Sequence, residues 1–193
     1  MSELMETFHA QARAEWARLA VALVEPDLVA AVDAAGLALL AALRGGAKVL
    51  VAGNGGSAAM SSHVAAEFAG KCVRDRDPLP ALSLAESPTA ITAIGNDYAF
   101  EQIFARQVRA HGRPGDVLIV MTTSGTSGNI TLALDAARAA GLATIALTGS
   151  RGEHLRERAD HVLVVPSDYT PRIQEVHLMW THAWCEAVDH AWP

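Results

Sequence analysis

The sequence predicts an α/β protein with a doubly wound sheet of five parallel strands, flanked by helices on both faces and preceded by a helical extension. Five short apolar runs lie between residues 48 and 166, separated by segments of helical composition. Three of the runs are almost entirely Val, Ile and Leu, as expected of parallel strands that are covered on both faces. The predicted strands are 48–53, 79–84, 116–122, 143–149 and 161–166.

Apolar positions three and four residues apart predict the helices. Two of them, at 3–24 and 27–43, precede the first strand, and a Gly-Gly pair at 45–46 ends the second. Three more, at 57–71, 98–111 and 129–140, lie between strands. A last helix at 171–190 starts with Pro171, where a missing N–H costs nothing. It carries Trp180 and Trp184 on one face, which indicates a buried helix.

Length and composition limit the classes of function. The 193 residues predict one domain, with helices in 1–45 and the α/β core with the C-terminal helix in 46–193. A net charge of −6 without a Lys/Arg block argues against nucleic-acid binding. Two cysteines and an N-terminus without signal-peptide features favour the cytoplasm. We also expect no membrane partner, because no apolar run reads as long enough to cross a bilayer.

Glycine and hydroxyl residues follow two of the predicted strands, at 53–57 and 122–129. Ligands of open α/β sheets gather at the carboxyl ends of the strands. Backbone N–H groups, hydroxyls and helix N-termini together form a phosphate cradle. Such loops also occur as ordinary turn and N-cap chemistry, but two in one short chain favour an anion site. Neither loop is a Walker A or GxGxxG motif, so nucleotide binding is disfavoured.

Two helices carry residues that could bind a metal ion. His63 and Glu67 lie one turn apart on one helix face, a spacing that suits either two ligands of one ion or a solvated pair. The C-terminal helix adds Gln174, His177 and His182. Gln174 and His182 are separated by a rise of about 12 Å and a rotation of roughly 80°, and His177 is nearer to Gln174. Spacing alone therefore leaves the choice between the two histidines open.

The motifs, in this order, resemble those of the sugar isomerase (SIS) domain family and, within it, the phosphoheptose isomerases. The resemblance covers nearly the whole chain and implies the SIS fold, which is flavodoxin-like. It rests on GNGGS at 53–57, HxxxE at 63–67, IGND at 94–97, TSGxS at 123–127 and RIQEVH at 172–177, followed by His182.

The resemblance implies a role for each site residue. It implies one zinc ion per subunit, with Glu67 and His182 also transferring protons as catalytic residues, and a homotetramer with sites at subunit interfaces. The implied zinc ligands are His63, Glu67, Gln174 and His182. The implied substrate-binding residues are Asn54, Gly55, Gly56, Glu67, Asn96, Asp97, Thr122, Thr123, Ser124, Ser127 and Gln174.

Three positions depart from the family pattern. Thr122 stands where Ser is usual and Thr126 where Asn is common. Pro171 replaces an Asp found in some members, and Asp168 is the nearby carboxylate that could take its place. The identity of the sugar is therefore less firmly implied than the class of reaction.

The activity implied by the resemblance is interconversion of D-sedoheptulose 7-phosphate and D-glycero-D-manno-heptose 7-phosphate through an enediol. This reaction is the first step of nucleotide-activated heptose biosynthesis. Two alternatives from other classes are a non-catalytic regulator, such as a replication-initiator-associating protein, and a sugar-phosphate sensor. Such regulators tend to lack the full histidine and glutamate set, so its presence at positions 63, 67, 174 and 182 favours the enzyme.

Overall fold

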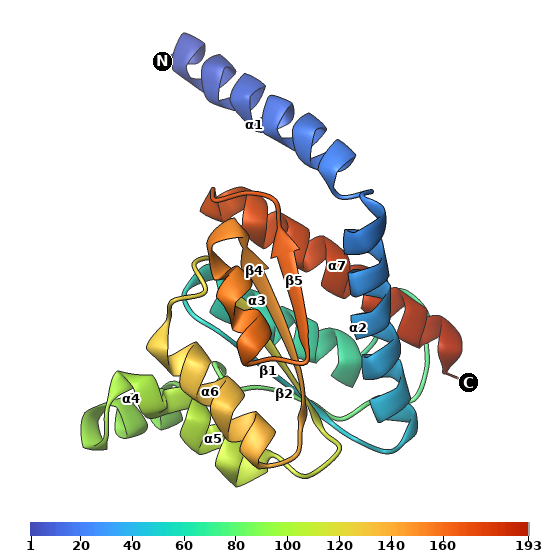
Figure 1. The fold of residues 1–193 in the computed structure, drawn as a ribbon, viewed down its shortest axis with the longest axis vertical. Coiled ribbons are helices and arrows are strands. Elements are labelled where there is room, and N and C mark those ends of the chain that lie inside the picture. Colours follow the sequence, from blue (N-terminus) through green and yellow to red (C-terminus); the bar gives the residue numbers. More distant parts are fainter. Residues whose placement is uncertain (193) are drawn as a thin grey trace.

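The computed structural model describes residues 1–192, and Pro193, the last residue of the predicted domain, lies outside them. Five strands form one sheet, and every neighbouring pair is parallel (Figure 1). The predicted five-stranded parallel sheet is therefore confirmed. From one edge of the sheet to the other, the strands lie in the order β2 (Ala81–Ser83), β1 (Val49–Gly53), β3 (Val117–Thr122), β4 (Ala143–Gly149) and β5 (His161–Val165).

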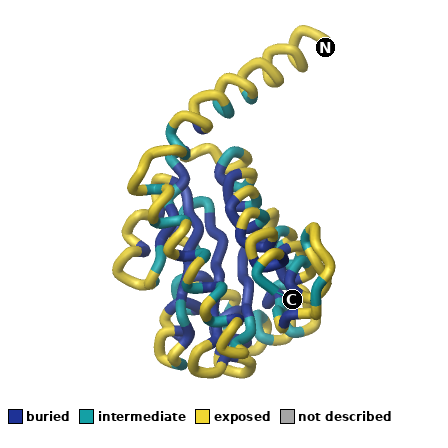
Figure 2. The backbone as a smooth tube through the Cα atoms, turned by 90° about the vertical axis from the view of Figure 1, so that its right-hand side faces the viewer, coloured by how far each residue is buried: buried dark blue, intermediate teal, exposed yellow. Residues whose placement is uncertain are grey.

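Helices cover both faces of this sheet, so the strands are buried between two layers (Figure 2). Successive strand residues point to opposite faces. Val49 and Val51 pack into the core beneath α2 (Pro26–Arg44), α3 (Gly56–Ala69) and α7 (Thr170–Ala191). Leu50 packs into the opposite core, beneath α5 (Ile103–His111) and α6 (Gly128–Ala139). This arrangement explains why the strands are apolar at nearly every position.

The first helix, α1 (Ser2–Ala22), projects away from the body of the molecule (Figures 1 and 2). Leu19 is its one buried residue. Leu4, Met5 and Phe8 are 58%, 55% and 57% exposed. An exposed apolar helix of this kind is typical of a surface that another chain covers.

The second helix, α2, contradicts the expectation that no apolar stretch could span a membrane. By length and composition α2 could cross a membrane, since it has 19 residues and a mean hydropathy of 1.7. The expectation that no apolar stretch is long enough is therefore wrong. In the structure Ala35, Leu39 and Leu43 of α2 pack into the core that β5 and α7 share. The core helix of a soluble protein meets the same length and composition test.

The predicted helix at 98–111 is also corrected. The structure has α4 (Pro88–Asp97), a 3₁₀ turn (Phe100–Gln102) and then α5. The backbone at Ala99 is fully extended, with φ 179° and ψ 159°, which separates the helices. Ser87 caps α4 by accepting a hydrogen bond from the N–H of Ala90, and Pro88 follows it. No residue of α4 is fully buried, and only Ile91 and Ile94, three residues apart, pack against the core, so the apolar pattern of this short helix is brief.

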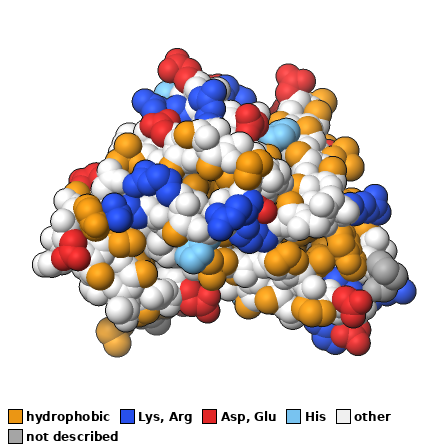
Figure 3. All heavy atoms as spheres, turned by 90° about the horizontal axis from the view of Figure 1, so that it is seen from below, with side chains coloured by type: hydrophobic (Ala, Val, Ile, Leu, Met, Phe, Trp, Pro, Cys, Tyr) orange, Lys and Arg blue, Asp and Glu red, His pale blue; other side chains and the backbone are white. Residues whose placement is uncertain are grey.

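Charged side chains are mixed over the face seen from below in Figure 3. Lys and Arg side chains lie there among Asp, Glu and apolar ones, and no field of a single charge covers that face. At this end of the sheet, Asp116 accepts hydrogen bonds from the main-chain N–H groups of Lys48 and Arg113, and pairs with the Lys48 ammonium. This buried carboxylate fixes the starts of β1 and β3, at the end opposite to the candidate site.

Candidate functional site

A small cavity of about 70 Å³ lies at the carboxyl ends of β1 and β3. The chain leaves β1 toward β2 on one side of the sheet and leaves β3 toward β4 on the other, so these strands flank the topological switch point. Open α/β sheets bind their ligands at this point. The lining residues are Asn54, Ser57, Met121, Thr122, Thr123, Ser124, Ser127 and Gln174.

The loop after β3 is held in a turn by its own hydroxyl groups. The Thr122 hydroxyl accepts a hydrogen bond from the N–H of Gly125, and the Ser124 hydroxyl accepts one from the N–H of Thr126. Gly125 has φ +73° and lies against the backbone of Gly152, where a Cβ would come within 2.4 Å of the Gly152 Cα. Glycine is therefore required here by both conformation and space.

Two helices begin at this cavity, and neither has a side-chain hydrogen bond at its N-cap. These are α3, capped by Gly55, and α6, capped by Ser127. Their first N–H groups and the positive ends of their dipoles are available to an anion. The cavity is therefore suited to a phosphate group.

An amide pair joins the two loops. Asn54 and Asn129 exchange hydrogen bonds of 2.9 and 2.8 Å between their side chains. Gln174 of α7 reaches the start of α3, where a Cβ on Gly56 would lie 2.7 Å from its Nε2. The Asn54 amide is thus engaged within the protein, while the Gln174 amide lies at the cavity. Asn129 is a site residue that the sequence does not reveal, because its partner Asn54 lies 75 residues away in the chain.

A second group of residues gathers where α3 and α7 pack together. The Nε2 atoms of His63 and His182 are 2.8 Å apart, and Glu67 Oε1 lies 3.6 Å from Nε2 of His63. The other carboxylate oxygen, Oε2 of Glu67, is buried and has no hydrogen-bond partner. A buried carboxylate oxygen without a partner is costly in a core and typical of a reactive or metal-binding position.

The chemistry of this group fits a zinc ion. Two imidazoles and a carboxylate are common zinc ligands, and the unpartnered Glu67 oxygen is a free donor. Within residues 1–192, no three His, Cys, Asp or Glu side chains have the spacing of a complete metal site. Zn–N bonds of about 2.0–2.1 Å in a tetrahedron place two nitrogens about 3.3 Å apart, so the histidine rings would separate slightly to share an ion.

Other predicted site residues lie elsewhere. Asn96 and Asp97 end α4, where the Asn96 amide donates to Asp97 Oδ1, and neither lines the cavity of this chain. Pro171 is exposed at the start of α7. Asp168 is exposed and accepts a hydrogen bond through its main-chain carbonyl, not its carboxylate. The structure therefore brings together the loop residues, and separately the His63–Glu67–His182 group, but leaves the α4 residues apart from both.

His177 is buried in the core. It is fully buried, its ring stacks on Trp180 at a centroid distance of 6.4 Å, and neither ring nitrogen has a side-chain hydrogen-bond partner. His182 is the histidine that faces His63. Burial lowers the pKa of His177 to about 4, against a backbone hydrogen bond at Thr148 that raises it.

His177 makes the fold sensitive to acid. Its pKa is near 6.5 when unfolded and about 4 when folded, so the unfolded state binds the proton first and stability falls as pH drops below about 6.5. We expect His177→Leu to remove about 2 kcal/mol of the difference in unfolding free energy between about pH 7 and pH 5. Urea unfolding at both pH values measures this difference in unfolding free energy. The substitution His190→Leu, at an exposed histidine, is the control. An unchanged pH dependence in His177→Leu would contradict this account.

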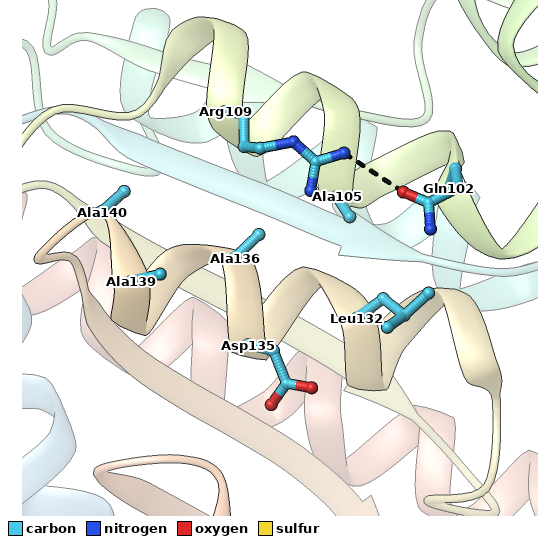
Figure 4. Close-up of a pocket in the computed structure, with 8 residues that line it drawn as sticks. All are labelled: Gln102, Ala105, Arg109, Leu132, Asp135, Ala136, Ala139 and Ala140. Atoms are coloured by element: carbon cyan, nitrogen blue, oxygen red, sulfur yellow. Dashed lines mark hydrogen bonds between the residues drawn. The ribbon is translucent and has the colours of Figure 1, made fainter.

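A larger groove lies away from the site, between α5 and α6 (Figure 4). Its volume is about 450 Å³, and four of its eight lining residues are alanines, with Arg109 donating a hydrogen bond to Gln102 at one side. It contains neither the glycine loops nor the histidines of the candidate site. We therefore assign phosphate binding to the smaller cavity at the switch point and the chemistry to the His63–Glu67–His182 group.

Comparison with known proteins defines first the protein family and then the group of enzymes within that family. The family model described as "SIS domain" matches residues 14–149. Phosphoheptose isomerase of Bradyrhizobium sp. (strain ORS 278) is 44% identical over 191 residues, covering 99% of this chain and 95% of the relative. Phosphoheptose isomerase of Rhodospirillum rubrum is 48% identical over 159 residues, covering 82% and 84%.

Solved structures agree with the curated relatives. Phosphoheptose isomerase from Neisseria gonorrhoeae superposes with a TM-score of 0.85 at 38% identity, covering 98% of both chains. The enzyme from Francisella tularensis gives a TM-score of 0.86 at 37% identity, covering 98% of this chain and all of the other. The chain belongs to the SIS domain family and, within it, to the phosphoheptose isomerases. The fold and family predicted from the sequence motifs are thus confirmed.

Proposed function

We propose that this chain is an aldose–ketose isomerase that interconverts D-sedoheptulose 7-phosphate and D-glycero-D-manno-heptose 7-phosphate. The observation that carries the proposal is the unpartnered, buried oxygen of Glu67, whose other oxygen lies 3.6 Å from the His63 ring that meets His182, on a helix that starts at the anion cavity. His63 lies about 10 Å along α3 from that cavity. An extended seven-carbon sugar separates its C1–C2 end from its 7-phosphate by a comparable length.

Glu67 and His182 supply the proton transfers. Isomerisation moves a proton between C1 and C2 and another between the two oxygens, through an enediol. In our proposal Glu67 takes the carbon-bound proton, and His182 donates a proton on the oxygen side. The Glu67 side chain is only 17% exposed, whereas that of His63 is 46% exposed, so the cluster is open to a ligand on the His63 side. The phosphate loop holds the remote end of the sugar, so binding there orients the reacting carbons.

The metal site completes the proposal. His63, Glu67, Gln174 and His182 would hold one zinc ion per subunit, which when bound supplies Lewis acidity at the sugar oxygens. Metal binding makes a carboxylate a weaker base, so Glu67 must use its second oxygen for the proton. Gln174 would then connect the metal site to the phosphate cavity, which it lines.

Zinc removal is expected to abolish turnover reversibly. Dialysis against a chelator should inactivate the protein, and added zinc should restore activity, because oxyanion charge is no longer neutralised without the ion. Turnover of sedoheptulose 7-phosphate, with metal content measured on the same sample, tests this expectation. Full activity in a demonstrably metal-free sample would refute the zinc proposal and leave the isomerase proposal standing.

Assembly is part of the proposed function. We propose a cytoplasmic homotetramer whose sites lie at subunit interfaces, acting at the first step of nucleotide-activated heptose biosynthesis. The exposed apolar residues of α1 support this, as does the position of Asn96 and Asp97 away from the cavity of their own chain. Sedimentation at micromolar concentration should give a tetramer, and a monomer there would contradict the proposed assembly.

A further inference from the structure

A buried ion pair between Arg76 and Asp189 joins the ends of α3 and α7. Nε of Arg76 lies 3.0 Å from Oδ1 of Asp189, and both side chains are fully buried. The loop after α3 carries Arg76, and Asp189 lies near the end of α7. Burying two charges is costly unless each polar atom finds a partner, so the remaining contacts of the pair decide what it does.

Arg76 binds the carboxyl end of α3. Its Nη2 donates to the carbonyl of Glu67 at 2.8 Å. Its Nη1 donates to the carbonyls of Phe68, Gly70 and Asp77 at 2.9, 3.1 and 2.9 Å. The last carbonyls of a helix have no partner within the helix and carry its negative partial charge, so a guanidinium is well suited to cap them. One of these carbonyls belongs to Glu67 itself.

Asp189 holds the segment that follows α3. Its Oδ2 accepts hydrogen bonds from the N–H groups of Cys72, Val73 and Arg74, at 3.0, 2.7 and 3.0 Å. Burial raises the pKa of Asp189, but these N–H groups and Arg76 outweigh it, so the pKa is lowered overall. The carboxylate is therefore charged and fully satisfied, and a neutral amide could not accept the same bonds.

The pair connects the two helices that carry the Glu67–His182 cluster. His182 precedes Asp189 by seven residues, which is about two turns, so both lie on one side of α7. On α3, Arg76 bonds the main chain of Glu67. A shift at this contact moves Glu67 relative to His182, whereas the phosphate cavity lies at the other end of α3.

We propose that Arg76 and Asp189 are positioning residues that fix the main chain at Glu67 and so hold Glu67 in place relative to His63 and His182. This rests on the proposed function, since it names the residues that set the geometry of the same site. Partners behind metal-binding side chains typically contribute about 10-fold to 100-fold to metal affinity or activity. The proposal therefore predicts a loss of kcat and zinc affinity with little change in KM, because the phosphate loop is not touched.

Asp189→Asn tests the proposal, with Asp116→Asn as its matched control. Both carboxylates are buried, accept main-chain N–H bonds and pair with a basic side chain, but Asp116 lies at the opposite end of the sheet. Each variant is assayed below its measured Tm. We expect Asp189→Asn to lower kcat and zinc affinity at least about 10-fold with KM within about twofold, and Asp116→Asn to change all three less than about twofold.

Arg76→Lys keeps the proposal testable if Asp189→Asn does not fold. Lysine retains the charge beside Asp189 but cannot bond four carbonyls, so the same losses are expected, in smaller degree. Equal effects of the Asp189 and Asp116 variants, or unchanged kcat and zinc affinity in folded Asp189→Asn and Arg76→Lys, would overturn the positioning role.

Zinc binding and sugar isomerisation by the unmodified protein show whether the proposed function or the positioning role has failed. If it binds zinc but does not isomerise sedoheptulose 7-phosphate, the proposed function fails, and zinc affinity in the variants decides the positioning role alone. If it isomerises the sugar and the variants match the control, only the positioning role fails. If it neither binds zinc nor isomerises the sugar, both are overturned.

Discussion

Glu67→Gln should reduce turnover of sedoheptulose 7-phosphate by about three orders of magnitude or more, which is near the full contribution of a general base. The amide has the same shape as the carboxylate but is not basic, so it cannot take the carbon-bound proton. The phosphate loop is untouched, so sugar phosphate should still bind. The fold should also persist, because Oε2 of Glu67 has no hydrogen-bond partner to lose.

The measurement is kcat beside substrate binding by calorimetry and Tm by thermal unfolding. A variant with normal Tm and normal binding but no turnover assigns the chemistry to Glu67. Turnover like that of the unmodified protein in Glu67→Gln would exclude the carboxylate as the base. Failure to bind the sugar would instead place Glu67 among the binding residues.

Among the substitutions outside the His63–Glu67–His182 group, Gly125→Ala should have the largest effect on binding of the phosphate end. Two costs combine at this position. A left-handed conformation costs an alanine about 1–2 kcal/mol, and its Cβ would lie 2.4 Å from the Gly152 Cα, which no rotamer can relieve. The loop must shift, and its N–H groups would no longer converge. We expect KM to rise at least about tenfold, and inorganic phosphate, which should compete with the sugar phosphate for the loop, to bind at least about tenfold more weakly.

Gly115→Ala is the matched control for this prediction. Gly115 has φ +92°, so alanine meets the same conformational cost, but nothing lies within 4 Å of its Cβ. Both variants should lower Tm, and only Gly125→Ala should raise KM. A KM unchanged in Gly125→Ala would show that the loop after β3 is not the phosphate site.

The sequence predicted the sheet well because its central strands are buried on both faces, which produces unbroken apolar runs such as residues 117–121. It missed α4, whose start is marked by Ser87 and Pro88 but which buries no residue. The prediction on membrane spans failed at α2, because most of its 19 residues are apolar and one of its faces packs on the core.

The parts of the candidate site that were predictable are those formed by residues close together in the sequence. Glycine and hydroxyl residues at strand ends indicated the phosphate loops, and the spacing of His63 and Glu67 indicated one helix face. Contacts between distant segments gave no such pattern. Spacing could not choose between His177 and His182, since the choice depends on which side of α7 faces α3. Arg76 and Asp189 are 113 residues apart and had no local signature.

The most direct test of the central claim is proton NMR of the purified protein with sedoheptulose 7-phosphate in D₂O, followed over time with and without added zinc. The account predicts an aldoheptose 7-phosphate that carries deuterium at C2, because the proton that Glu67 removes exchanges with solvent before it returns. No product under either condition, from protein shown to be folded, would contradict the isomerase assignment and favour a regulator or a sugar-phosphate sensor.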